Sequence, residues 1–400
     1  MDTGVRIAMV AGEESGDQLA APLIAALRRR LPGARFFGIG GAAMQSHGFE
    51  SWYSMETLSV RGYAEAVRSI PRILSIRRGL KARLLSDPPD VFIGVDAPDF
   101  NLALEESLRN AGVPTVHYVS PSIWAWRGER IHRIKRAADR VLTLFPFEVL
   151  LYERAGVPVT YVGHPYADEL PEVADRDAAR EQLRLPTGPP VFALLPGSRQ
   201  GELVQHAGLF VETAKRIRAQ LPEARFLIPL SSRATRRQFL QALYDCDAGE
   251  LPATVLFGHA RVAMTAADVV LVASGTAALE AALLGRPMVI TYRVPALTWR
   301  LMWPRRYLPY VGLPNVLAGR FVVPEILQQA ATAENLAQAL INQLHDKFVR
   351  ERQISMFGHL YRQLRRGAAD CAAEAVLPVI RRRTADVQSR PPRLAESSRS

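Results

Sequence analysis

Short apolar segments recur along this chain, and each is followed by a turn and then by a segment with helical spacing. In the first half these segments are Val5–Val10, Arg35–Ile39, Val91–Val95, Thr115–Val119, Val141–Leu144 and Val159–Val162. In the second half they are Val191–Leu195, Arg225–Pro229, Thr254–Phe257, Val269–Val272 and Met288–Tyr292. Strands that alternate with helices are typical of parallel sheets with helices on both faces. The sequence therefore predicts an α/β protein with two doubly wound parallel-sheet domains.

The composition changes between the two halves, where proline and acidic residues concentrate. A chain of 400 residues also exceeds one ordinary core and fits two domains. We expect a first domain over 1–165 that is completed by a helix over 349–380, a linker over 166–189, a second domain over 190–348 and a disordered basic tail over 381–400.

The sequence favours a cytoplasmic protein without a membrane span. The N-terminus enters a strand directly, so we expect no signal peptide. The apolar window Ala266–Leu284 contains Asp268 and Glu280, which favours a buried strand and a helix over a span. Cys246 and Cys371 lack metal or redox spacing, as expected in a reducing compartment.

The net charge of +11 requires an anionic partner or a solvated basic surface. Nucleic acid is disfavoured because no recognised binding module is present. In Arg61–Arg83 and Trp299–Tyr307, basic residues interleave with apolar or aromatic ones, a pattern that suits a membrane surface. The alternative is ordinary amphipathic helices packed on a core. The residues that carry the membrane interpretation are Arg68, Arg72, Arg77, Trp299, Trp303 and Arg305.

Two turns in the second half suit a nucleotide diphosphate. Leu195–Arg199 joins a strand to a helix, so that backbone N–H groups, the helix dipole and an arginine face one anion. Ala273–Glu280 is a second such turn, with small residues and a carboxylate further along the helix. The candidate binding residues are Gly197, Ser198, Arg199, Ser274, Gly275, Thr276 and Glu280.

Two turns in the first half carry carboxylates. Gly12–Asp17 departs from the G-x-G-x-x-G fingerprint, and its charges would repel a pyrophosphate, so a sugar-hydroxyl ligand suits it better. The alternative is a helix N-terminus capped by Asp17. Asp96–Asn101 places two carboxylates after a buried strand, where one can accept a proton from an attacking hydroxyl, or form only an Asx turn. His117–Arg127 adds aromatic residues that stack on sugars or pack in the core.

The sequence predicts no metal site and no cofactor. Asp175-Arg176-Asp177 matches a D-x-D pattern, but it lies at the start of a helix far from any strand end, where capping is expected. The histidines are scattered without ligand spacing.

Six motifs in this order resemble the lipid-A-disaccharide synthases, an inverting glycosyltransferase family (family 19) with the GT-B fold. They are Ala11–Asp17, Asp96–Asn101, His117–Arg127, Leu195–Arg199, Ala273–Glu280 and Leu313–Asn315, within a resemblance from about Val5 to Leu377. Glu14 departs from the family, which commonly has a small uncharged residue there.

The resemblance implies two Rossmann-like domains facing a cleft and a glycosyl transfer from UDP-2,3-diacylglucosamine to 2,3-diacylglucosamine 1-phosphate (lipid X). The products are the lipid A disaccharide 1-phosphate and UDP, formed at the cytoplasmic face of the inner membrane by a peripheral protein. The resemblance leaves both a monomer and a homodimer open. Asp96 is the first candidate for the base, with Asp99 or Glu13 behind it. The acceptor or cleft residues are Gly12, Ser15, Trp126 and Asn315.

Two alternatives stay open at this point. One is another UDP-sugar enzyme of the same fold, such as a UDP-GlcNAc 2-epimerase or a lipid-intermediate N-acetylglucosaminyltransferase. The other is a non-catalytic UDP-binding protein of the membrane surface, which would tolerate the loss of Asp96.

Overall fold

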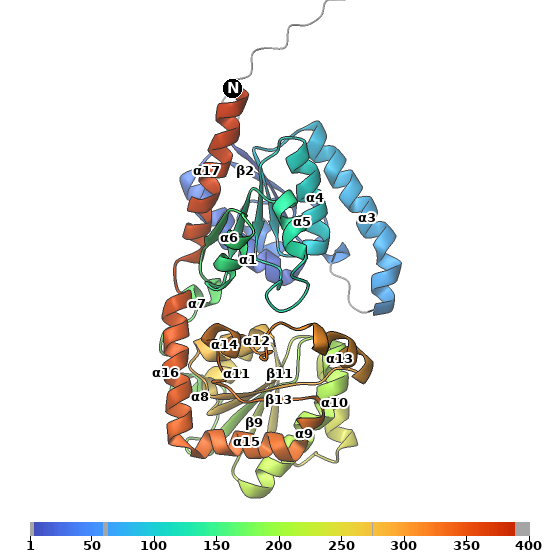
Figure 1. Cartoon of the computed structure of the whole chain (residues 1–400). Helices are drawn as coiled ribbons and strands as arrows, with labels where there is room; N and C mark the ends of the chain where they lie inside the picture. The colour runs from blue at the N-terminus through green and yellow to red at the C-terminus, as the bar shows by residue number, and fades with distance from the viewer. Residues whose placement is uncertain (1–3, 59–62, 274, 389–400) are drawn as a thin grey trace, which may run out of the picture. The chain divides into compact units, whose positions relative to one another are not determined.

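The computed structural model describes residues 4–58, 63–273 and 275–388, with side chains except at 63–69, 302 and 381–388. The chain divides into two compact units (Figure 1). The first unit runs to Pro165 and resumes at Arg366, and the second is Tyr166–Arg365.

The first unit is built on seven parallel strands in the order β3-β2-β1-β4-β5-β6-β7. Their bounds are β1 Arg6–Ala11, β2 Arg35–Ile39, β3 Glu50–Tyr53, β4 Val91–Val95, β5 Thr115–Tyr118, β6 Arg140–Thr143 and β7 Val159–Tyr161. Its helices are α1 Glu14–Arg30, α2 Ala42–Ser46, η1 Met55–Thr57, α3 Tyr63–Ser86, α4 Pro98–Asn110, α5 Arg130–Ala137, α6 Glu148–Arg154 and α17 Ala368–Gln388.

Both faces of this sheet are buried, as the apolar runs predict for parallel strands. In β1, Ile7 and Met9 pack into one core cluster with α1 and α17, while Ala8 and Val10 face a second cluster with α3 and α4. The side-chain period of two therefore sends alternate residues of one strand to opposite helical layers.

The second unit has six parallel strands in the order β10-β9-β8-β11-β12-β13. Their bounds are β8 Val191–Leu195, β9 Arg225–Leu230, β10 Ala253–Phe257, β11 Val269–Ala273, β12 Met288–Tyr292 and β13 Glu325–Leu327. Its helices are α7 Pro165–Glu169, α8 Arg176–Gln182, α9 Gln200–Gln220, α10 Arg233–Asp245, α11 Ala260–Ala266, α12 Thr276–Leu283, α13 Ala296–Met302, η2 Trp303–Arg305, α14 Leu313–Ala318, η3 Gln328–Ala330, α15 Ala333–His345 and α16 Lys347–Leu364. The helices α9 and α15 cover one face of this sheet (Figure 1).

The strand order reverses once in each sheet. In the first unit it reverses between β1 and β4, and in the second between β8 and β11. Open α/β sheets bind ligands beyond the carboxyl ends of the strands at such a switch point. All four strand ends at these two points lead into turns that the sequence marks as candidate site motifs.

Three expectations about the chain's organisation differ from the structure. The single helix expected over 349–380 is two helices, α16 and α17, because Gly367 has φ +69° and Arg365 is extended. The helix α16 belongs to the second unit, and α17 continues to Gln388 because no helix breaker lies between 381 and 388. The first part of the segment expected as a disordered tail is therefore helical.

The segment expected as a linker is instead packed into the second unit. It contains α8, from which Arg176 and Arg180 pair with Asp268 at 3.0 and 2.7 Å. Of the helices that the structure describes, none combines the length and apolar character needed to cross a membrane.

Candidate active site

In the first unit, the loops after β1 and β4 touch at the switch point. A Cβ added at Gly12 would lie 2.8 Å from the Cβ of Ala97, closer than side chains pack. The glycine is therefore required by the approach of the two loops. Glu13 and Ser15 follow it on the exposed start of α1.

Asp96 and Ala97 hold a left-handed backbone at the end of β4, with φ of +51° and +43°. Such a conformation costs a residue with a Cβ roughly 1–2 kcal/mol. The buried Asn101 offsets this cost, because its amide nitrogen donates to the Asp96 carbonyl at 2.8 Å and to the Val10 carbonyl at 3.3 Å. The Asx turn considered from the sequence is thus replaced by a strained turn that Asn101 braces.

The three candidate bases have different surroundings. The Asp99 carboxylate is 81% exposed and accepts a hydrogen bond from Arg130 at 2.9 Å. Asp96 is half-buried, and its carboxylate forms no ion pair with any residue that the structure describes. Glu13 is exposed at the N-cap of α1. The Asp96 carboxylate is therefore less committed to a cation than that of Asp99.

A buried ion pair that the sequence did not single out lies below this turn. His117 Nδ1 and Glu105 Oε1 are 2.7 Å apart, and both side chains are fully buried. Burial raises the pKa of Glu105. Burial opposes protonation of His117, yet the adjacent Glu105 carboxylate outweighs it and leaves the His117 pKa raised. Gly94 makes room for the pair, since a Cβ there would lie 2.0 Å from Glu105 Oε1.

The aromatic loop after β5 is held by a second buried cluster. Ser120 Oγ and Tyr152 Oη share a hydrogen bond of 2.7 Å, and Glu148 accepts one from the Phe145 N–H at 3.1 Å. Burial raises the pKa of Glu148 to about 8. Trp126, the candidate acceptor residue, is half-buried at the end of this loop.

Asp17 has a role different from the cap of its own helix. Its buried carboxylate accepts hydrogen bonds from the N–H groups of Gly41, Ala43 and Met44 at 2.8, 2.9 and 3.1 Å. It therefore caps α2, which follows the neighbouring strand.

In the second unit, the turn after β8 is organised by Glu202, which the sequence analysis missed. Glu202 Oε2 accepts hydrogen bonds from the N–H groups of Ser198 and Arg199 at 2.9 and 3.2 Å. Gly197 has φ +124°, and a Cβ there would lie 2.6 Å from Glu202 Oε2. In this structure the Ser198 N–H, which the sequence suggested as a phosphate donor, is therefore occupied by Glu202. The Arg199 guanidinium is 76% exposed at the same turn.

The turn after β11 forms the other side of this switch point. Gly275 has φ +147° and precedes Thr276, the first residue of α12. Ser274 lies outside the described residues. Glu280 Oε1 accepts from Arg261 Nε at 2.9 Å, and Arg261 also pairs with Glu169 at 3.0 Å. The Glu280 carboxylate is thus oriented by an arginine.

Asn315 does not line a surface. It is fully buried, and its amide nitrogen donates to Glu325 Oε1 and to the Val323 carbonyl, both at 2.8 Å. Its oxygen accepts from the N–H groups of Val322 and Val323. Asn315 instead fixes the segment that leads into β13.

The first of the two membrane patches lies on α3. Arg72 is exposed next to Ile70, which is 49% exposed, whereas Leu80 and Leu84 are buried in the core. Arg77 is half-buried and donates to the Asp99 carbonyl at 3.4 Å, so it contacts the candidate site. The side chain of Arg68 lies outside the described residues.

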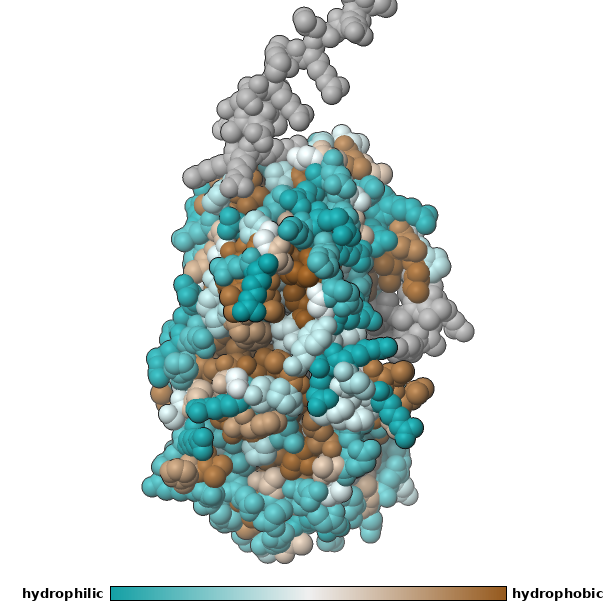
Figure 2. Space-filling model, in the orientation of Figure 1, coloured by the Kyte–Doolittle hydropathy of each residue, from teal (hydrophilic) through white to brown (hydrophobic). Residues whose placement is uncertain are grey.

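The second patch lies on α13 and η2. Trp299 and Trp303 stack with ring centroids 4.0 Å apart, and Arg305 is exposed beside them. Leu297 and Leu301 are 71% and 53% exposed. Figure 2 shows apolar surface over part of α3 and of α13 next to hydrophilic surface.

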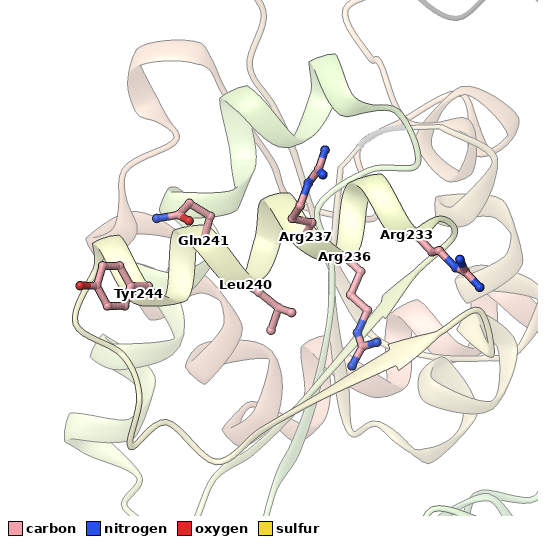
Figure 3. A pocket seen from close by; sticks show the side chains of 6 residues that line it. All are labelled: Arg233, Arg236, Arg237, Leu240, Gln241 and Tyr244. Atoms are coloured by element: carbon pink, nitrogen blue, oxygen red, sulfur yellow. The ribbon is translucent and has the colours of Figure 1, made fainter.

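A hollow of about 520 Å³ lies along α10 and not at the strand ends. Figure 3 shows Arg236 and Arg237 pointing to different sides of this helix. The arginines of α10 therefore do not converge on one ligand.

Comparison with known proteins identifies the family. The family model described as lipid-A-disaccharide synthetase matches residues 7–378. The lipid-A-disaccharide synthases of Dechloromonas aromatica and Chromobacterium violaceum are 59% and 55% identical to this chain, over 94% of it and 99% and 98% of their own lengths. Among solved structures, a putative UDP-N-acetylglucosamine 2-epimerase from Listeria monocytogenes has a TM-score of 0.64 at 13% identity, covering 98% of this chain and 99% of its own. The UDP-GlcNAc 2-epimerase from Neisseria meningitidis has a TM-score of 0.63 at 13% identity, covering 94% and 99%.

The structural neighbours are too distant in sequence to show more than the fold, which is GT-B with two parallel-sheet α/β domains. The sequence relatives decide between the alternatives left open above. The chain belongs to the lipid-A-disaccharide synthase family, the glycosyltransferases that form the disaccharide of lipid A.

Proposed function

We propose that this synthase transfers the sugar of UDP-2,3-diacylglucosamine to lipid X with inversion, and that Asp96 is the base. The acceptor hydroxyl oxygen attacks the anomeric carbon as the bond from that carbon to the UDP oxygen breaks. The hydroxyl proton passes to the Asp96 carboxylate, and the electron pair of the broken bond stays on the β-phosphate of UDP. Inversion requires such a base on the face opposite the leaving group.

The position of Asp96 is the observation that carries this proposal. It lies at the β1/β4 switch point, on a strained backbone that Asn101 braces, and its carboxylate is not engaged by an arginine as that of Asp99 is. Strained backbone clusters at functional sites, where it fixes the direction of a side chain. Gly12, Ser15 and Trp126 are the candidates for contacting the acceptor sugar.

The leaving diphosphate is assigned to the β8/β11 switch point of the second unit. Arg199 supplies an exposed guanidinium, and the N-terminus of α12 supplies a positive dipole end. Glu280, oriented by Arg261, is assigned to the ribose hydroxyls. These groups offset the charge that grows on UDP as the glycosidic bond breaks.

Both substrates carry acyl chains, so the reaction is proposed to occur at the cytoplasmic face of the inner membrane. The basic and apolar side chains exposed on α3 and α13 support this placement, because tryptophan and arginine favour the headgroup layer.

The test compares Asp96→Asn with its matched control Asp99→Asn. UDP release and the lipid product are followed by mass spectrometry in detergent, with UDP-2,3-diacylglucosamine and lipid X as substrates. Asp96→Asn is expected to lower kcat about 10²–10⁴-fold with little change in UDP affinity, since it removes a proton acceptor. A full rate in Asp96→Asn would show that Asp96 is not the base, and a larger loss in Asp99→Asn would transfer the role to Asp99.

A further inference from the structure

A second charged pocket lies in the second unit at the opposite end of the sheet from the nucleotide turns. Asp268 immediately precedes β11, and Gly275 follows its other end, roughly 17 Å along the strand. Beside Asp268 is a cavity of about 370 Å³ whose walls include Arg176, Arg286 and Arg350. They come from α8, from the segment that precedes β12 and from α16.

Positive charge in this pocket exceeds the negative charge available to it. Asp268 is already saturated, since it accepts from Arg176 and Arg180 and from the Val191 N–H at 2.9 Å. The other lining carboxylate, Glu172, pairs with Arg362 at 3.5 Å.

Two of the lining guanidinium groups have no anionic partner among the residues that the structure describes. Arg286 donates to the carbonyls of Leu284 and Ala174 at 3.0 and 3.5 Å, and Arg350 donates to the Leu344 carbonyl at 2.6 Å. A carbonyl oxygen accepts a hydrogen bond from a guanidinium group but does not neutralise the positive charge of that group. Burial lowers the pKa of Arg286, and the positive charge of Arg176 lowers it by more than the Asp268 carboxylate raises it.

The pocket also has an apolar wall. Leu284 and Pro287 line it from the β12 side, and Val173 and Ile354 are 84% and 41% exposed at its rim. The cavity is therefore lined by guanidinium groups and by apolar side chains. Its volume is within the range of small-molecule sites.

We propose that this pocket binds a small phosphate ester, with its phosphate between Arg286 and Arg350 and its organic part against Val173 and Ile354. Guanidinium forks match phosphate oxygens in pairs, and burial of the phosphate neutralises two uncompensated cations. The site is separate from the nucleotide turns and does not depend on the roles proposed for them.

The experiment is calorimetric titration of the full chain with inorganic phosphate and with hexyl phosphate, at constant ionic strength and in saturating UDP. UDP keeps the proposed nucleotide site occupied, so any remaining binding reports a second site. We expect both probes to bind, and hexyl phosphate to bind more tightly because of the apolar wall. Arg350→Gln is expected to weaken both about tenfold through the lost charged contact.

The matched control is Arg352→Gln, an exposed arginine on the same helix, which is expected to leave both affinities unchanged. Thermal unfolding provides an independent readout: each probe should raise the Tm of the UDP-saturated wild type and not that of Arg350→Gln. The proposal is overturned if neither probe binds the UDP-saturated wild type, or if Arg350→Gln folds and binds both as the wild type does.

Discussion

The two switch points belong to similar sheets but are built from opposite backbone chemistry. In the first unit, the residues that follow β4 carry side chains on a left-handed backbone, at Asp96 and Ala97. In the second unit, the turns after β8 and β11 place glycine there, at Gly197 and Gly275. This difference agrees with the proposed roles: a side chain would be needed where a base is aimed, and glycine where a backbone approaches a ligand closely.

The charges differ in the same sense. The first switch point presents carboxylates, and the second presents an arginine and the N-terminus of α12. The comparison suggests that the two units have separate roles. The first unit would accept the proton of the acceptor hydroxyl, and the second would stabilise the negative charge on the leaving UDP. The variants below test this division, from the largest expected effect to the smallest.

Arg199→Ala should have the largest effect. Loss of a charged donor to the diphosphate is expected to lower kcat/KM about 10²–10³-fold and to weaken UDP binding, with little change in Tm because Arg199 is exposed. Calorimetry with UDP and a turnover assay measure both effects. Arg236→Ala, an exposed arginine of the same unit, is the control. If Arg199→Ala bound UDP as tightly as the wild type, the diphosphate of UDP would not be bound at this turn.

Asn101→Ala should disturb the turn at the first switch point and leave the second switch point unchanged. It leaves the buried carbonyls of Asp96 and Val10 without their donor, and we expect a loss of about 2 kcal/mol in the free energy of unfolding together with reduced kcat. Denaturant unfolding and UDP titration are compared with Asn110→Ala, at the exposed end of the same helix. If UDP affinity fell with kcat, the two units would not divide the work as described.

Glu202→Ala should loosen the second switch point. It removes the acceptor of the Ser198 and Arg199 N–H groups, at an expected cost of about 1 kcal/mol in stability and several-fold in UDP affinity. Glu202→Gln keeps an acceptor oxygen and should retain most of both. Equal Tm and UDP affinity in Glu202→Ala and the wild type would show that Gly197 holds the turn unaided.

Glu148→Gln should change the pH dependence of stability. The folded pKa of Glu148, about 8, lies above the unfolded value near 4.5, so the folded state holds the extra proton between these values. The stability of the wild type should therefore fall as the pH rises from about 5 through 8, and the variant should lose this contribution. Tm measured across this range in both proteins tests the sign; parallel curves would place the Glu148 pKa near its usual value.

The sequence predicted best the elements whose burial is complete. The bounds of β8 and β12 match the predicted strands because continuous apolar runs leave little choice. The edge strands β3 and β13 were missed because each begins with a glutamate and carries only two apolar residues. The break between α16 and α17 depends on one left-handed glycine inside a pattern that otherwise reads as helix.

The candidate site divides in the same way. Asp96, Arg199 and Gly275 were chosen because they lie within four residues of a strand end, a position that the local sequence reveals. The contacts that hold the site join distant residues: Asn101 reaches Val10, and Arg261 links Glu280 to Glu169. Such pairings are set by the packing of the sheet and its helices, and local patterns do not encode them. Asn315 was chosen for its motif, but its side chain is buried and hydrogen-bonded to Glu325, a contact that the local sequence does not reveal either.

The position of α17 determines the order in which the chain can be completed during synthesis. Its Ala372 and Val376 pack in the same cluster as Ile7 and Met9, and its Asp370 pairs with Arg30 of α1. The first unit therefore cannot complete the burial of this face of its sheet until α17 has left the ribosome, whereas the second unit is one continuous segment and is finished earlier. The usual order, in which the N-terminal domain folds first, is reversed here. A nascent chain stopped before residue 366 would expose that apolar face, and this is the stage at which the protein most needs a chaperone.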